Sequence, residues 1–161
     1  MKDTKIISAF PACGKTYCFK NSEDYIVLDS DSSEFSWKYV DDGNNGWHKE
    51  RNPDFPDNYI CHIKANIGKV DYIFVSSHAE VRKALADAGI EFILVFPHSS
   101  LKAEWIGRCF LRGSGEAFCK LVASNWDEWI SQMHEDAIVN NRKHYILKPG
   151  EYLSGAIKFI N

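Results

Sequence analysis

Residues 9–16, with the sequence AFPACGKT, have the residue types and the spacing of a phosphate-binding loop. They match the pattern GxxxxGK[ST], except that Ala9 takes the place of the first glycine. In this pattern Gly14 lets the backbone approach a phosphate, Lys15 reaches the β and γ oxygens, and Thr16 offers a hydroxyl to Mg²⁺. We therefore expect the loop to bind a nucleoside triphosphate, with ATP and Mg²⁺ as the cofactors.

The context of the loop favours a binding site over a chance match. The loop follows the apolar run KIISAF and opens a segment with helical character, so its amides and the helix N-terminus together can surround an anion. The alternative is an ordinary strand-to-helix turn whose lysine is solvated. The expected nucleotide-binding residues are Ala12, Cys13, Gly14, Lys15, Thr16 and Tyr17.

Two carboxylates follow the second apolar run, in YIVLDSDSSEF. Asp29 and Asp31 would lie at the carboxyl end of a strand, where open α/β sheets bind their ligands. Asp29 is the candidate for Mg²⁺ together with Thr16, and Asp31 is the candidate for contact with a phosphoryl acceptor, as a proton acceptor if that acceptor is an alcohol. The alternative is that DSDSS caps the next helix. The third apolar run ends in Ser76-Ser77, at a position where many phosphate-loop enzymes have an acidic residue. The sequence therefore does not decide which acidic side chain binds the metal.

A pair of arginines follows the fourth apolar run. Arg108 and Arg112 are four residues apart, so they share one helix face, and Arg112 adjoins a Gly113–Gly115 hinge. Two guanidinium groups on a movable arm can neutralise a transferring phosphoryl group, which makes residues 99–115 a candidate helical lid. The alternative for Arg108 is an ion pair with Glu104, four residues earlier.

The remaining chain alternates strand and helix patterns within one domain, residues 1–161. KIISAF, DYIVLD, VDYIFVSS, EFILVFP and KHYILKP are short apolar runs bounded by breakers, and helical spacings separate several of them. We therefore expect a three-layer α/β fold with a mostly parallel sheet of five strands. Residues 41–57 are polar and rich in Gly, Asn, Asp and Pro, which predicts a long loop of functional or mobile character.

Composition excludes several classes of protein. The net charge of −3 argues against a large basic surface for nucleic acid, although a local basic patch is compatible with it. The five cysteines show no metal-binding spacing, which favours free thiols in a reducing compartment. No signal peptide and no membrane span is evident, so we expect a cytoplasmic protein without a membrane partner. The sequence does not predict an oligomeric state.

The order of strand, phosphate loop, helix, strand ending in DSD and arginine-bearing helical pair resembles the small P-loop kinases, such as nucleoside monophosphate kinases and shikimate kinase. NPDFPDNYICHIK, VDYIFVSSHAEVRKAL and NWDEWI also look like small phage and prophage proteins described as nucleotide kinases. The resemblance covers nearly the whole chain. A phage-encoded protein of this kind would act in the host cytoplasm.

The resemblance implies roles for the residues already singled out. Lys15, Asp31, Arg108 and Arg112 would be catalytic, with the two arginines in the lid. Residues 41–57 occupy the region where such kinases often bind the acceptor. There Trp47 would stack on a base, while Lys49 and Arg51, beside His48, would bind a monophosphate. An alternative is a solvated loop.

The expected function is transfer of a phosphoryl group from ATP to a nucleotide acceptor, a (deoxy)nucleoside monophosphate. A kinase of an alcohol acceptor, such as a nucleoside, a small metabolite or a nucleic-acid 5′ end, is an alternative. So is a nucleotide-binding regulator without transfer activity.

Overall fold

The chain folds around one parallel β-sheet with helices on both faces. The computed structural model describes residues 1–160, and its main sheet has five strands in the order β2-β5-β1-β6-β7, all parallel. The α/β fold with a five-stranded sheet expected from the sequence is therefore confirmed. The strands are β1 (Lys5–Ala9), β2 (Val27–Asp29), β5 (Tyr72–Ser76), β6 (Ile93–Pro97) and β7 (His144–Leu147).

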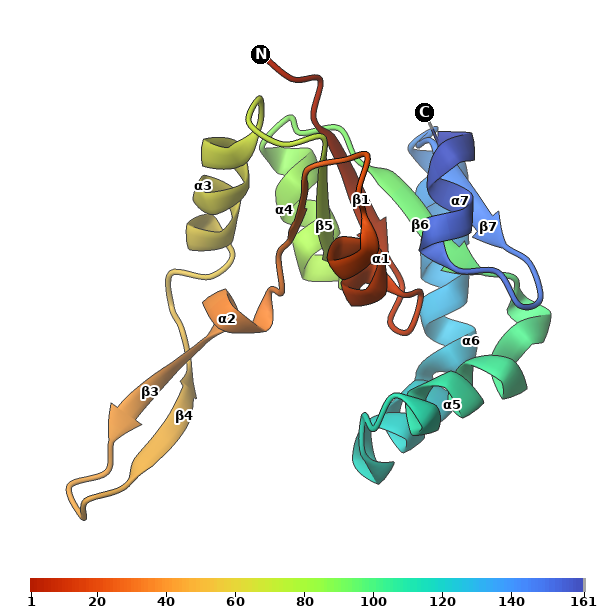
Figure 1. Ribbon diagram of the computed structural model, residues 1–161. Coiled ribbons are helices and arrows are strands. Elements are labelled where there is room, and N and C mark those ends of the chain that lie inside the picture. The colour runs from red at the N-terminus through yellow and green to blue at the C-terminus, as the bar shows by residue number, and fades with distance from the viewer. Residues whose placement is uncertain (161) are drawn as a thin grey trace.

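The helices form two layers around this sheet. Helices α1 and α7 contact each other on one face, whereas α3 contacts α4 and α6 packs on β6 (Figure 1). The helices are α1 (Lys15–Asn21), α2 (Ser33–Ser36), α3 (Asp57–Asn66), α4 (Ala79–Asp87), α5 (Lys102–Leu111), α6 (Glu116–Val139) and α7 (Leu153–Ile160), with a 3₁₀ turn at Ser99–Leu101.

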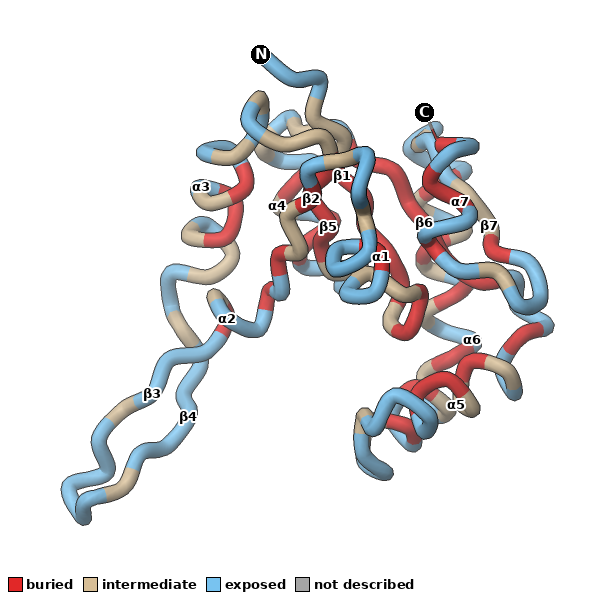
Figure 2. The backbone as a smooth tube through the Cα atoms, viewed as in Figure 1, coloured by how far each residue is buried: buried red, intermediate tan, exposed pale blue. Residues whose placement is uncertain are grey.

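Burial explains why the central strands are continuous apolar runs. Strands β1, β5 and β6 are covered on both faces, so nearly every residue in them is buried, and β6 is buried along its whole length. Figure 2 shows this buried centre and the more exposed helices around it. The sheet therefore supplies a rigid base whose carboxyl edge positions the loops that follow β1, β2 and β5.

The segment after β2 corrects one prediction from the sequence. The long loop expected at residues 41–57 is wrong in its first half, because β3 (Trp37–Asp41) and β4 (Trp47–Arg51) pair as an antiparallel hairpin. The hairpin projects away from the main sheet (Figure 1). Its strands are almost entirely exposed, so they lack the buried apolar alternation that identifies a strand in a sequence.

Helices α5 and α6 follow each other without an intervening strand, as the sequence predicts. Residues 112–115 connect them, and both helices extend beyond the carboxyl edge of the sheet (Figure 1). Trp126, Ile130 and Met133 of α6 are buried, which assigns them to the core. Within residues 1–160, no helix combines the length and apolar character that crossing a membrane requires.

Candidate active site

The connection from β1 to α1 lies at the carboxyl edge of the sheet and has a strained backbone. Ala12 and Gly14 both have positive φ, 62° and 89°. A Cβ added at Gly14 would lie 3.2 Å from Cδ1 of Tyr152, so both conformation and space require glycine there. Strain of this kind persists only where neighbouring groups hold the backbone in place.

The groups that hold this loop come from α5 and from the first residue of α7. Trp105 Nε1 donates to the carbonyl of Pro11 at 2.9 Å, and Leu153 N donates to the carbonyl of Cys13 at 2.9 Å. Arg108 Nη1 donates to the carbonyl between them, that of Ala12, at 3.3 Å. Because three successive carbonyls are bound from outside the loop, its amides can face the opposite side, as an anion site requires.

Lys15 points back into the loop. Its Nζ donates to the carbonyl of Ala9 at 2.9 Å, and burial of the ammonium lowers the pKa of Lys15. An anionic ligand would relieve this cost because it supplies the opposite charge. The neighbouring Cys13 is buried, which raises the pKa of its thiol to about 12 and keeps it neutral.

Thr16 and Asp29 are brought together from different elements. Thr16 Oγ1 at the start of α1 donates to Asp29 Oδ2 at the end of β2, over 3.1 Å. A hydroxyl and a carboxylate beside a phosphate loop are hard oxygen ligands, the kind that Mg²⁺ takes alongside phosphate and water. The residues present therefore fit the expected cofactors, ATP and Mg²⁺. Among residues 1–160 no group of three or more His, Cys, Asp or Glu side chains forms a metal site by itself.

Asp31 makes a local hydrogen bond just before the short helix α2. Its Oδ1 accepts from Ser33 N at 2.9 Å, which forms a turn ahead of the helix, whereas the N-cap residue itself is Ser32 and makes no side-chain cap bond. Asp31 is exposed and lines the cleft described below. The segment before it is anchored to α3, where Tyr59 Oη donates to the carbonyl of Ser30 at 2.7 Å and His62 Nε2 lies 3.0 Å from Ser30 Oγ.

The end of β5 carries serine hydroxyls, at the position where many phosphate-loop enzymes have an acidic residue. Ser32 Oγ donates to Ser76 Oγ at 3.0 Å, and Ser8 Oγ donates to the carbonyl of Ser76 at 3.0 Å. These bonds join the ends of β1, β5 and the segment after β2. The structure thus leaves Asp29 as the carboxylate that contacts the residue expected to bind the metal.

Two clefts meet at the loop between β1 and α1. Lys15, Thr16 and Arg112 line both of them. One cleft, of about 880 Å³, adds the remainder of the loop and residues of α5 and α7: Ala12, Cys13, Gly14, Tyr17, Arg108, Leu111, Tyr152 and Ser154. The other, of about 690 Å³, extends past Asp29 and Asp31 to the hairpin. A donor on one side and an acceptor on the other would therefore meet at the same three side chains.

The two arginines of the expected lid differ in their surroundings. Arg108 is buried, with its guanidinium 3.7 Å from the ring centroid of Trp105 and 3.9 Å from that of Tyr152, and it also donates to Glu104 Oε2 and the carbonyl of Glu151. Arg112 is exposed and donates to Ser114 Oγ. Arg108 therefore supports the loop from behind, whereas Arg112 is accessible to a ligand in either cleft.

The hairpin residues expected to bind an acceptor are spread along β4. Arg51 lines the second cleft and donates to Glu80 Oε2 at 2.6 Å, whereas Lys49 Nζ lies 5.3 Å from the Trp37 ring centroid. Trp47 lies at the outer end of β4 and is 70% exposed.

Sequence reasoning missed several residues of these clefts. Trp37, Phe55 and His78 line the second cleft, and Tyr152 lines the first. Burial, followed by the charge of Lys15, lowers the pKa of His78, so its imidazole is neutral at pH 7. Trp37 alternates with Tyr39 before a turn-rich segment, which was the available signal for the hairpin. No sequence signal marked Tyr152, because its role depends on how α7 returns to the loop.

Comparison of the chain with protein-family models finds no match, and comparisons with curated proteins and with solved structures find none either.

Proposed function

We propose that the chain is an ATP-dependent phosphotransferase whose acceptor is a (deoxy)nucleoside monophosphate. The proposal depends on one observation: two clefts share the side chains of Lys15, Thr16 and Arg112. They meet at the β1–α1 loop, whose carbonyls accept hydrogen bonds from residues outside the loop. A site that only stored a nucleotide would need one of these clefts. Transfer needs a donor and an acceptor in line across the same charges.

The proposed roles follow from position. The triphosphate binds the amides of residues 12–16, and Lys15 contacts its terminal phosphates. Mg²⁺ supplies charge neutralisation of the phosphates, and Thr16 with Asp29 would hold it there. Tyr152, which is 45% exposed and packs on Arg108, would contact the nucleoside of the donor.

Charge neutralisation is the main contribution expected from the protein. The transferred phosphoryl group carries its charge on equatorial oxygens, and Lys15 and Arg112 are the cations between the clefts. A phosphate acceptor attacks with an oxygen that is already anionic, so it needs no strong base. Trp37 and Arg51 at the far end of the second cleft would bind its base and its charge.

An alcohol acceptor is the second candidate, because Asp31 lines the same cleft. Its Oδ1 is held by Ser33 N, so the carboxylate has a fixed orientation from which it can accept a hydroxyl proton. Turnover with nucleosides as against nucleoside monophosphates separates the two candidates, since only an alcohol acceptor needs the carboxylate as a base.

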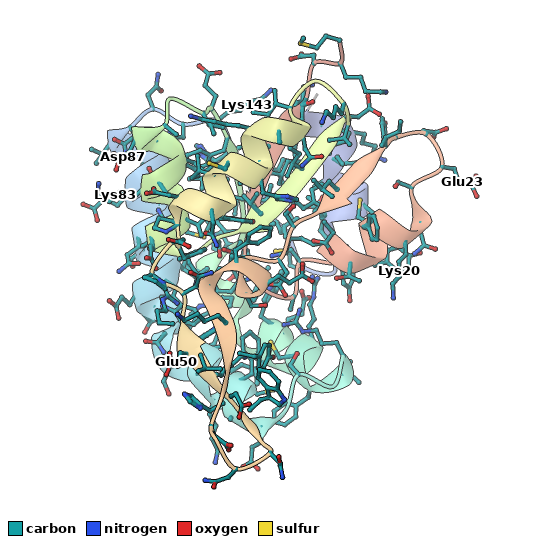
Figure 3. The ribbon with its side chains drawn as sticks, turned by 90° about the vertical axis from the view of Figure 1, so that its left-hand side faces the viewer. Lys20, Glu23, Glu50, Lys83, Asp87 and Lys143 are labelled. Carbon is teal, nitrogen blue, oxygen red and sulfur yellow. The ribbon has the colours of Figure 1, made fainter. Side chains whose placement is uncertain are left out.

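The test is ADP formation from ATP and Mg²⁺ across a panel of ribo- and deoxynucleoside monophosphates and the corresponding nucleosides. Lys15→Ala is the loss-of-function variant, and Lys20→Ala is its matched control, because Lys20 lies exposed at the end of the same helix (Figure 3). A monophosphate-dependent signal that Lys15→Ala abolishes and Lys20→Ala retains would support the proposal. ATP binding without ADP formation from any acceptor would contradict it and favour a nucleotide-binding regulator.

A further inference from the structure

One face of the β3–β4 hairpin combines aromatic and charged side chains in opposed pairs. Residues directly opposite each other in an antiparallel pair project to the same side, and every second residue of a strand does so too. This face, named the outer aromatic face here, carries the pairs Trp37–Arg51, Tyr39–Lys49 and Asp41–Trp47. Each pair thus sets one aromatic ring beside one charged group.

The rings of this face are open to solvent. Tyr39 is 69% exposed, Trp47 is 70% exposed and Trp37 is 37% exposed. Figure 2 shows the hairpin as the longest stretch without buried residues. A hairpin of two strands is at best marginally stable alone, and the rings on this face form a surface that a ligand could cover.

The acidic side chains of the two hairpin strands lie away from the middle pair of this face, because Glu50 is on the reverse face and Asp41 is in the outer pair. Glu50 lies on the reverse face, where His48 Nε2 is 2.8 Å from its Oε1, and the side chain projects from the hairpin in Figure 3. Asp41 accepts a hydrogen bond from Gly43 N at 2.8 Å within the turn. Lys49 therefore gives the middle of the outer aromatic face a positive character.

The face is continuous with the acceptor cleft. Its inner pair, Trp37 and Arg51, lines that cleft. The outer pair lies four residues further along β3, about 13 Å at the rise of an extended strand. A mononucleotide that keeps its phosphate near Lys15 would contact the inner pair and leave the outer two pairs without a ligand.

We propose that the outer aromatic face binds single-stranded nucleic acid, with the terminal nucleotide of the strand in the acceptor cleft. Rings at two-residue intervals stack on successive bases, and a cation among them contacts the backbone, which is how strands are bound without sequence preference. The net charge of −3 is compatible with a local basic contact of this kind, but not with a long strand-binding surface. The inference rests on the proposed function only for the assignment of the cleft to the acceptor.

Self-association through this face is the competing occupant. A two-fold interface places the same patch of both copies together, and an axis across the middle pair of this face would set Lys49 against the Lys49 of the second copy. Like charges at such a contact are unfavourable, whereas a polyanion is attracted to them. The chemistry of the face therefore favours nucleic acid.

The test uses the full chain and an oligothymidylate labelled with fluorescein at its 3′ end, followed by fluorescence anisotropy at low and moderate salt. We expect the strand to bind at least tenfold more tightly than thymidine monophosphate does in competition. The variant Tyr39→Ala/Trp47→Ala should bind the strand at least about tenfold more weakly than the wild type, because bases can no longer stack on the two rings. Its affinity for the monophosphate should be unchanged, because Tyr39 and Trp47 are not among the residues that line the acceptor cleft, contrary to the role expected for Trp47 from the sequence.

A matched pair of charge variants isolates the face. Lys49→Ala and Lys38→Ala remove the same charge from opposite sides of the hairpin. We expect Lys49→Ala to weaken strand binding and to lower by about 1 the slope of log affinity against log salt concentration. Lys38→Ala should keep most of the strand affinity. The same experiment with oligouridylate distinguishes DNA from RNA as the source of the strand.

Equal strand affinity of the wild-type chain and Tyr39→Ala/Trp47→Ala would overturn the inference. So would a dimer, seen by light scattering, that this double variant converts to monomer, since the face would then join two copies. Strand binding that depends on Lys49, in a chain that transfers phosphate to no acceptor, would support the inference and contradict the proposed function.

Discussion

Thr16 Oγ1 and Asp29 Oδ2 lie 3.1 Å apart, which joins the first turn of α1 to the last residue of β2. The two residues are thirteen positions apart in the sequence and meet because β2 runs parallel to the central strands, so both lie at the same sheet edge. In the proposed function this hydroxyl and this carboxylate would hold Mg²⁺ together with phosphate oxygens of the nucleotide.

Asp29→Asn is expected to raise the Mg²⁺ concentration needed for half-maximal turnover by at least about tenfold, because loss of even an outer partner of a metal ligand commonly has an effect of that size. The amide keeps the size of the side chain and removes its charge. Titration of ADP formation with Mg²⁺ at saturating ATP measures the effect. Asp24→Asn, an exposed residue before β2, is the matched control. An unchanged Mg²⁺ dependence in Asp29→Asn would remove this residue from the proposed metal site.

Gly14→Ala is expected to lower ATP affinity by at least about tenfold and to destabilise the fold by about 1–2 kcal/mol, because alanine is strained at positive φ. The added Cβ would also lie 3.2 Å from Cδ1 of Tyr152. Equilibrium dialysis with ATP and urea unfolding measure the two effects.

Gly89→Ala separates the backbone effect from the site effect. Gly89 has φ +69°, and apart from Gly89 and its two chain neighbours no heavy atom among residues 1–160 lies within 4 Å of the Cβ position there. This variant should lose a similar amount of stability and keep its ATP affinity. Equal loss of ATP affinity in both variants would show that Gly14 matters only through global stability.

The sheet could be predicted because its strands carry their own signal. β6 (Ile93–Pro97) is buried at every position, so its apolar run is uninterrupted and its bounds are visible in the sequence. The hairpin could not be predicted in the same way, since Trp37 and Tyr39 stand among polar residues and neither is buried. Its stability depends on cross-strand pairs, which a pattern of burial does not reveal.

The site was predicted where a motif fixes the local chemistry and missed where the fold brings distant segments together. Gly14, Lys15 and Thr16 are contiguous, so their pattern is visible in the sequence. Arg108 was expected on a lid because its spacing to Arg112 suggests a shared face, but it also bonds the carbonyl of Ala12, 96 positions earlier in the chain. Contacts of such separation are set by tertiary packing.

Arg108→Ala and Arg112→Ala are expected to differ in kind. Removal of the buried Arg108 side chain leaves the carbonyls of Ala12 and Glu151 without this donor and opens space beside Trp105, so the cost is about 2–4 kcal/mol of folding free energy. Arg112 is exposed, so Arg112→Ala should keep the stability of the wild type.

Turnover distinguishes the same two variants. Loss of a cation from a transferring phosphoryl group lowers kcat by a factor on the order of 10³ in the systems where an arginine has this role. We expect Arg112→Ala to lower kcat by at least about tenfold with little change in KM for ATP. Urea unfolding and steady-state kinetics on both variants check the assignment, and a fully active Arg112→Ala enzyme would contradict the catalytic role of Arg112.

Asp136 is the centre of an ion-pair network behind the end of β5. Its two oxygens lie 2.7 Å from Arg82 Nη1 and 2.7 Å from Arg142 Nε, and Arg82 Nε also donates to the carbonyl of Ser77 at 3.0 Å. Burial alone would raise the pKa of Asp136, but the hydrogen bonds from Arg142, Arg82 and Asn140 outweigh it and lower the pKa below its usual value.

Asp136→Asn is therefore expected to destabilise the fold by about 3–5 kcal/mol at pH 7, because two largely buried guanidinium groups lose their counter-charge.

The lower folded-state pKa means that the wild-type carboxylate contributes its full stability above the unfolded pKa of 3.8 and loses it as pH falls through the folded value. The difference between the two proteins should be constant from pH 7 to about pH 5 and shrink below about pH 4. Urea unfolding at a series of pH values measures this difference, with Asp87→Asn, from the exposed Lys83–Asp87 pair on α4, as the control. A difference that stays the same at low pH would show that the charge of Asp136 is not what stabilises the network.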